Sequence, residues 1–126
     1  MTTLTPYLTV DDAAGAIAFY GKAFGAVERM RHPMGDGRLG HAELAIDDAV
    51  LMLSDEYPQV GARSPRSLGG ATTAIVLAVD DVDAAYSRAV DAGATADRPP
   101  SDDGYGRRGW LVDPYGHRWC VESPAG

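Results

Sequence analysis

Apolar and polar residues follow one another along this chain in an order that occurs twice. Short runs of β-branched and aliphatic residues at 7–10 and 75–79 predict strands. Each run leads into Val-Asp-Asp, and apolar residues at helical spacing follow, among them Ile17, Tyr20 and Phe24 in the first half. The pattern therefore predicts a strand followed by a helix at the start of each half of the chain.

The residues that flank the two predicted helices fit helix ends. Asp12 and Asp81 stand where a side-chain carboxylate can accept the free amide hydrogens of a first helical turn. Gly25 and Gly93 stand where a residue in the left-handed conformation would end each helix. The sequence thus contains a start signal and an end signal for each predicted helix.

More strands are expected after each helix. Turn signals, Gly-Asp-Gly at 35–37 and Asp-Pro-Tyr-Gly at 113–116, separate alternating or apolar runs. The expected strands are 27–34, 41–46, 49–54, 108–112 and 118–122. The chain therefore predicts an α+β fold, a single domain over 1–126 with two βαβββ modules at about 3–54 and 73–123. A Gly/Pro/Ser-rich connector at 55–72 joins them.

Composition limits the classes of binding partner that are expected for this domain. The net charge is −7, and the arginines and the single Lys22 form no basic run, which argues against nucleic acid and suits a cationic ligand. No apolar segment is long enough to cross a bilayer, so no membrane partner is expected. The N-terminal residues lack the features of a secretory signal, and one cysteine cannot form an intramolecular disulfide. We expect a cytoplasmic protein.

Several segments resemble one known family. The segments are "TPYLTVDDAAGAIAFYGKAFGA", "HAELAIDDAVLMLSDE", "SPRSLGG", "VDDVDAAYSRAVDAGA" and "DPYGHRW". With the tandem βαβββ plan, they resemble the vicinal oxygen chelate superfamily, which includes glyoxalase I, bleomycin-resistance proteins and extradiol dioxygenases, and within it the PhnB-like branch. The resemblance implies a cupped mixed β-sheet with helices on its outer face.

The resemblance also implies where a metal would bind. In the metal-binding members, four His, Glu or Gln ligands come from the first and last strands of each module. The corresponding positions here are Thr5, Met52, Ala74 and Cys120. These are not the nitrogen and oxygen ligands of a divalent cation, so we expect no metal and no cofactor. His117 and Cys120 are three apart, but on a strand that spacing puts them on opposite faces, and His117 is expected to cap the hairpin or lie on its rim.

Strand alternation selects a candidate acid/base pair. In "HAELAI", Ala42 and Leu44 should pack on the helices, which leaves His41 and Glu43 in the cup. A histidine and a carboxylate on one concave face can act as acid and base. They can equally form a structural pair that holds neighbouring strands together.

Five further residues are candidates for ligand binding. Arg107 could clamp an anion or pair with an acid at the rim, and Tyr7 and Trp110 could stack on a planar ligand or belong to the core. Met52 and Cys120 could line an apolar wall. Arg107 shares a face with Gly109 near the mouth of the cup, whereas the parity of Trp110 points to the opposite face.

These observations favour a metal-free protein that binds a small molecule in the β-cup, by sequestration or as a resistance protein does. The alternative is a glyoxalase-like lyase, isomerase or dioxygenase that uses a metal or the His41/Glu43 pair. Each module makes an incomplete cup with exposed sheet edges, so a homodimer is expected.

Overall fold

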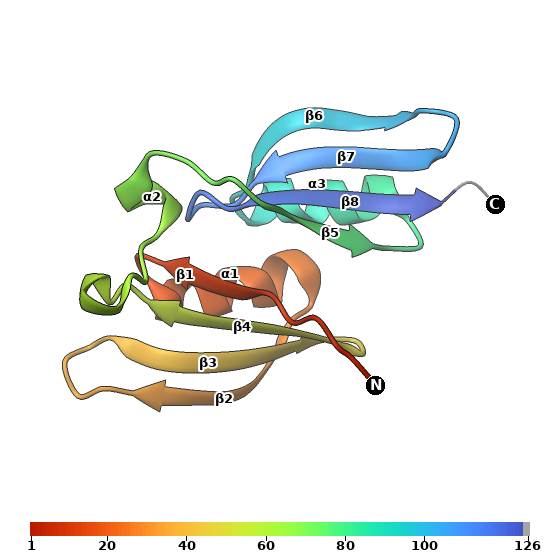
Figure 1. Cartoon of the computed structure of the whole chain (residues 1–126). Coiled ribbons are helices and arrows are strands. Elements are labelled where there is room, and N and C mark those ends of the chain that lie inside the picture. Colours follow the sequence, from red (N-terminus) through yellow and green to blue (C-terminus); the bar gives the residue numbers. More distant parts are fainter. Residues whose placement is uncertain (125–126) are drawn as a thin grey trace.

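The computed structural model describes residues 1–124 and contains two βαβββ modules (Figure 1). Module 1 consists of β1 (Tyr7–Val10), α1 (Ala13–Phe24), β2 (Val27–Pro33), β3 (Leu39–Ile46) and β4 (Ala49–Asp55). Module 2 consists of β5 (Ala74–Ala78), α3 (Val82–Ala92), β6 (Thr95–Asp102), β7 (Gly106–Val112) and β8 (Arg118–Pro124). The expected α+β fold is confirmed.

The helix ends follow the sequence signals. The carboxylate of Asp12 accepts a hydrogen bond from the Gly15 amide, and that of Asp81 accepts one from the Ala84 amide. Gly25 ends α1 with a φ of 72°, a left-handed conformation that favours glycine. None of the helices within residues 1–124 is long and apolar enough to span a bilayer.

The strands form two four-stranded sheets, in the orders β1-β4-β3-β2 and β5-β8-β7-β6. In each sheet the first strand runs parallel to the last strand of its module, and the other pairs are antiparallel. β1 and β5 are edge strands that lie next to each other, and α1 and α3 cover the same side of both sheets (Figure 1). We call the uncovered side of each sheet its open face.

The hydrophobic core lies on the helix side and joins the two modules. Leu44 and Leu53 of module 1 and Leu111 and Val121 of module 2 are buried there. α1 packs against module 2 through aromatic rings, since the ring centroids of Phe24 and Trp119 are 4.5 Å apart. Shared burial of large aromatic side chains is therefore one of the contacts that hold the two modules together.

β6 is a strand that the sequence pattern did not delimit. It contains Pro99 and Pro100, and its pairing with β7 shifts register on both sides of Arg98. Proline lacks an amide hydrogen and so donates no hydrogen bond to a neighbouring strand, which confines it to edge strands. This explains why β6 occupies the outer edge of its sheet.

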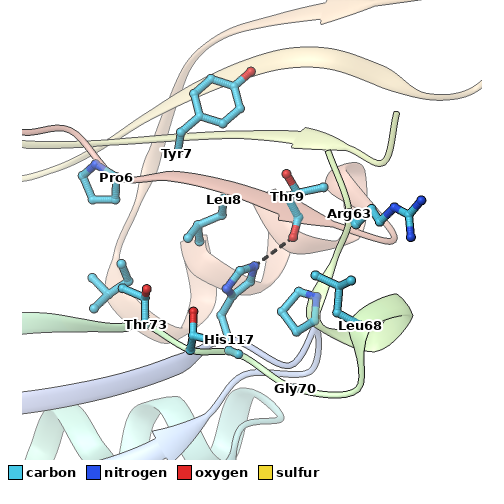
Figure 2. A pocket seen from close by; sticks show the side chains of 13 residues that line it. Pro6, Tyr7, Leu8, Thr9, Arg63, Leu68, Gly70, Thr73 and His117 are labelled. Atoms are coloured by element: carbon cyan, nitrogen blue, oxygen red, sulfur yellow. Dashed lines mark hydrogen bonds between the residues drawn. The ribbon is translucent and has the colours of Figure 1, made fainter. Parts of the chain in front are cut away.

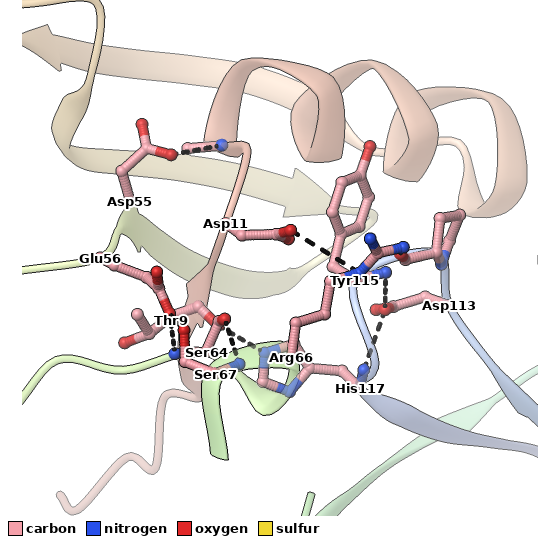
Figure 3. Close-up of polar contacts among 12 residues, drawn as sticks. Thr9, Asp11, Asp55, Glu56, Ser64, Arg66, Ser67, Asp113, Tyr115 and His117 are labelled. Carbon is pink, nitrogen blue, oxygen red and sulfur yellow. Dashed lines mark hydrogen bonds and ion pairs between the residues drawn. The ribbon is translucent and has the colours of Figure 1, made fainter. Parts of the chain in front are cut away.

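The connector is more ordered than its composition indicated. It contains a 3-10 turn (Pro58–Val60) and a short helix, α2 (Pro65–Leu68). Ser64 is fully buried, its amide donates to Glu56 over 2.7 Å, and its hydroxyl caps α2 at the Ser67 amide (Figure 3). The hydroxyl of Ser67 also donates to the Glu56 carboxylate, and these bonds lower the pKa of Glu56. The connector is thus anchored to the end of β4.

Candidate binding face

The open face of module 1 carries three of the predicted site residues in one row. Tyr7 pairs with Met52 across β1 and β4, and Met52 pairs with Glu43 across β4 and β3. Ala42 and Leu44 are buried on the opposite side, as alternation along β3 predicted. His41 therefore shares the open face with Glu43, Met52 and Tyr7.

His41 is held by a tyrosine rather than by a carboxylate. The Tyr7 hydroxyl lies 2.8 Å from His41 Nδ1, and the two rings are 5.4 Å apart. Tyr7 is 51% exposed, so it does not belong to the core. Within residues 1–124, His41 makes no hydrogen bond to Glu43. The contact therefore orients the imidazole at the surface of the open face, available to a ligand.

The open face of module 2 carries a matching row. Val76 pairs with Cys120, Cys120 pairs with Trp110, and Trp110 pairs with Arg98. Trp110 thus lies on the same face as Cys120, although its parity along the chain pointed to the other face. Val112 and Arg118 close the β7–β8 hairpin, and counting back two residues from this pair places Trp110 opposite Cys120.

Arg107 does not lie on the open face, which corrects its expected position near the mouth of the cup. Its guanidinium binds both carboxylate oxygens of Asp83 in α3, at 2.8 and 2.9 Å, and Asp102 at 3.3 Å. These bonds raise the pKa of Arg107. Gly109, two residues on, faces Tyr86 of α3. The alternative considered for Arg107, an arginine paired with acids, is what the structure shows.

Two other arginines flank Trp110 instead. The guanidinium carbon of Arg98 lies 4.6 Å from the indole centroid, and that of Arg118 lies 5.3 Å from it. Sequence reasoning missed both residues. Arg118 stands two residues before Cys120, so strand parity placed it on the same face; Arg98 stands in β6, which had no strand signal of its own.

Cys120 lies beneath this surface. Its side chain points to the open face in register with Trp110, yet the residue is only 1% exposed. Burial and the nearby Glu122 carboxylate raise the pKa of the thiol. A protonated, covered thiol is a poor nucleophile and a poor metal ligand. The Cys120 side chain therefore provides an apolar contact beneath the side chains of Val76 and Trp110, its neighbours across the sheet.

A cleft of about 330 Å³ runs between β1 and β5 at the end covered by α2 (Figure 2). Tyr7 and Thr9 line one wall, Ile75 lines the other, and Arg63 and Leu68 of the connector border it. A second cleft of about 250 Å³ continues along the same gap beside Thr5, Val50 and Val76. The gap thus separates the two open faces and adjoins both.

His117 closes the cleft and ties the modules together. Its Nε2 lies 2.8 Å from the carbonyl oxygen of Thr9, to which the ring N–H donates (Figure 2). Its amide donates to Asp113, which also accepts from the Tyr115 amide (Figure 3). His117 was expected to cap the hairpin or lie on its rim; it does lie beside that turn, and it also reaches β1.

The residues at the four family ligand positions do not fit a divalent cation. Met52 and Cys120 offer sulfur, Ala74 offers nothing, and Thr5 offers a neutral hydroxyl. Within residues 1–124, no three His, Cys, Asp or Glu side chains are grouped so as to hold a metal ion.

Sequence comparisons connect the chain to a family. The family model described as "Glyoxalase/Bleomycin resistance protein/Dioxygenase superfamily" matches residues 2–121. An uncharacterized protein of Mycobacterium tuberculosis (strain ATCC 25618 / H37Rv) is 50% identical over 125 residues, covering 96% of this chain and 74% of the relative. Anthracycline biosynthesis protein DauV of Streptomyces sp. (strain C5) is 32% identical over 116 residues, covering 90% of this chain and 38% of that protein.

Solved structures share the architecture. Protein PA1353 from Pseudomonas aeruginosa has a TM-score of 0.79 at 23% identity, with 98% of each chain covered. TioX from Micromonospora sp. ML1 has a TM-score of 0.76 at 24% identity, with 99% of this chain and 100% of that chain covered. At these identities the likeness establishes the fold only. The chemical class of the ligand has to be inferred from the residues of the open faces.

Proposed function

The chain belongs to the glyoxalase/bleomycin resistance protein/dioxygenase superfamily, and we propose that it is a metal-free member that binds a small molecule on its open faces. We place it in the PhnB-like branch on the strength of the motifs around residues 10–26 and 113–119. The resemblance to this superfamily implies a cupped sheet that binds small ligands, and one relative is named for anthracycline biosynthesis.

One observation carries this proposal: the four positions that would hold a metal are Thr5, Met52, Ala74 and Cys120. Chemistry through a bound cation needs at least three good ligands, and this set does not supply them. The same residues suit the wall of a binding site, where apolar side chains surround a few polar groups. Tyr7, His41 and Glu43 supply such polar groups beside Met52.

Elemental analysis and a ligand screen test the proposal together. We expect dialysed protein to contain Zn, Ni, Fe and Mn far below one atom per chain. In a thermal-shift screen of small molecules, we expect a hit whose affinity falls by about fivefold or more in His41→Ala or Glu43→Gln, the size of one lost hydrogen bond. Glu28→Gln is the matched control, because Glu28 pairs with Arg31 on β2 rather than with the open-face row.

Two results would contradict the proposal. One is a stoichiometric transition metal that is lost when an open-face residue is changed. The other is a confirmed ligand whose affinity is the same in wild type and in both open-face variants. In the second case the binding surface lies elsewhere on the molecule.

We also propose that two copies of the chain pair with their open faces toward one another, so that the ligand is enclosed between the copies. Large apolar side chains are exposed there, with Val76 54% and Tyr7 51% accessible, and Met30 pairs with Glu43 on the same face. Covering such side chains is favourable, and a two-fold axis would set one copy against the other. Light scattering should give twice the chain mass at micromolar concentration; a monomer would refute this part.

The second candidate function is metal-free acid/base catalysis, and the Tyr7–His41 hydrogen bond is the observation that favours it. A tyrosine hydroxyl at 2.8 Å fixes the orientation of the imidazole, as a general base requires. Turnover of a bound ligand by wild type, abolished in His41→Gln while binding persists, would select this function over binding alone.

A further inference from the structure

The charge around Trp110 is opposite in sign to the charge of the whole chain. The chain has a net charge of −7, yet Arg98 and Arg118 both place their guanidinium groups near the indole of Trp110. Within residues 1–124, neither arginine has a carboxylate within 4.0 Å, whereas Arg107 and Arg108 have two each. Two cations thus face the same ring without an acid to neutralise them.

The Glu122 carboxylate on this face is already engaged by another arginine. Glu122 lies on the same open face as Trp110, and its Oε1 accepts from Arg108 at 3.1 and 3.3 Å. Arg108 also binds Asp103. Glu122 is therefore held by Arg108, and the row that ends at Arg98 contains no acidic residue, since its other members are Val76, Cys120 and Trp110.

The shape of the surface adds an apolar component. Across the sheet, Val76, Cys120 and Trp110 form one row that ends at Arg98. Indole and the flat guanidinium groups both stack on planar ring systems. Guanidinium groups also donate paired hydrogen bonds to a carboxylate or a phosphate. Together the row offers a stacking surface and an oxyanion site a few ångströms apart.

We infer that Trp110, Arg98 and Arg118 form a subsite for an aromatic acid, a flat ring system that carries an oxyanion. The inference rests on the proposed function and names the chemical class of its ligand. It replaces the cationic ligand that the net charge suggested, because the local charge at the binding surface, rather than the sum over the chain, selects the ligand.

Three probes separate the ring from the charge: 2-naphthoate has both, 2-naphthamide keeps the ring without the charge, and acetate keeps the charge without the ring. The two indole N–H signals in an amide NMR spectrum report the site. Trp110 is on the open face, whereas Trp119 is 1% exposed and donates to Asp113, so it serves as an internal reference. We expect 2-naphthoate to shift the Trp110 signal and leave the Trp119 signal in place.

Calorimetry then measures what each arginine contributes. Arg98→Gln and Arg118→Gln should each weaken 2-naphthoate binding about tenfold, the scale of a hydrogen bond to a charged group. The double variant should bind 2-naphthoate no better than 2-naphthamide. Arg29→Gln is the matched control, since it removes one positive charge from an exposed position on β2 in module 1. Unchanged backbone amide spectra establish that the variants are folded.

Three results would overturn the inference: equal affinity for acid and amide, undiminished affinity in the double variant, or an unmoved Trp110 signal. These results leave the proposed function standing if other molecules bind and respond to His41→Ala. If none of the probes binds and the wider screen also finds no ligand for the open faces, the inference and the proposed function fail together.

Discussion

The Tyr7 hydroxyl and His41 Nδ1 lie 2.8 Å apart and join β1 to β3 across the intervening β4. When the hydroxyl donates to Nδ1, a neutral imidazole carries its proton on Nε2; when the proton is on Nδ1, the ring donates to the hydroxyl. Nε2 is a donor in the first tautomer and a free base in the second. Binding of a ligand acceptor at Nε2 requires the first tautomer, whereas acid/base catalysis requires the second.

Tyr7→Phe should release this constraint. We expect nitrogen-15 spectra of wild type near pH 8 to show a His41 ring protonated at Nε2, and the variant to show a mixture of the two tautomers. Tyr105→Phe is the control, because Tyr105 is exposed and lies in the β6–β7 turn. Identical His41 ring spectra in wild type and Tyr7→Phe would show that the tyrosine does not select the tautomer in solution.

Arg107→Gln should leave ligand binding unchanged. The side chain is bound to Asp83 on the helix side of the sheet, and exposed ion pairs of this kind add little stability. We expect a small decrease in melting temperature and the same affinity for any ligand that responds to Arg98→Gln. A selective loss of ligand affinity in Arg107→Gln would show that Arg107 takes part in ligand binding.

Tyr20→Phe should destabilise the protein substantially. The Tyr20 hydroxyl donates over 2.5 Å to Asp113 in the shared core, where the Trp119 indole donates to the same carboxylate oxygen. Loss of a buried hydrogen bond to a carboxylate costs about 1.5–3 kcal/mol of the free energy of unfolding. Urea titration measures this cost. Tyr115→Phe is the control, since within residues 1–124 the Tyr115 hydroxyl has no hydrogen-bond partner, and it should change stability much less.

The same tyrosine should make part of the stability depend on alkaline pH. Burial, then the charge of Asp113, raises the pKa of Tyr20 well above its usual value of about 10. A raised pKa in the folded state gives stability that is complete below the unfolded value and declines as pH rises above it. The stability difference between wild type and Tyr20→Phe should therefore be constant up to about pH 10 and shrink beyond it. A difference that grows above pH 10 would contradict this assignment.

Gly109→Ala should be poorly tolerated. A Cβ at this position would lie 2.7 Å from Cδ2 and 2.9 Å from Cε2 of Tyr86, whose hydroxyl is fixed on the Trp110 carbonyl. We expect a loss of about 1–3 kcal/mol of unfolding free energy from overpacking. Gly40→Ala is the comparison, because its new Cβ would meet only the flexible Met34 side chain. Equal stability of the two variants would mean that α3 moves away from β7 without cost.

The sequence predicted local structure well where one pattern decides it. Asp12 and Gly25 delimit α1, and alternation placed His41 and Glu43 on the open face. The prediction failed for side chains whose face of the sheet depends on which residues of neighbouring strands are paired. Trp110 and Arg107 lie on the faces opposite to those expected, because the expectation put Gly109 on the cup side and followed parity along one strand from there. The expected strand ends, Val112 and Arg118, do pair in the structure, and pairing across the loop at 113–117 puts Trp110 beside Cys120.

The remaining differences have tertiary causes. The sequence pattern did not delimit β6, which contains Pro99 and Pro100, yet the strand forms because it needs to pair on one side only. The connector looked unstructured because its order comes from Glu56, a residue at its start that binds Ser64 and Ser67 further along. Arg98 and Arg118 were overlooked because neither belongs to a motif, and only the folded sheet brings them to one indole.

Between β1 and β5, within residues 1–124, no backbone ladder holds the two sheets at a set distance. A ladder would impose a spacing of about 4.8 Å whatever the side chains. Here side chains hold the two sheets apart: the rings of Phe24 and Trp119 pack behind the gap, and His117 bonds to the Thr9 carbonyl oxygen across it. The width of the cleft consequently depends on side-chain volume. Substitutions among these side chains can change the width of the cleft while every strand keeps its partners, so one fold can accept ligands of different thickness.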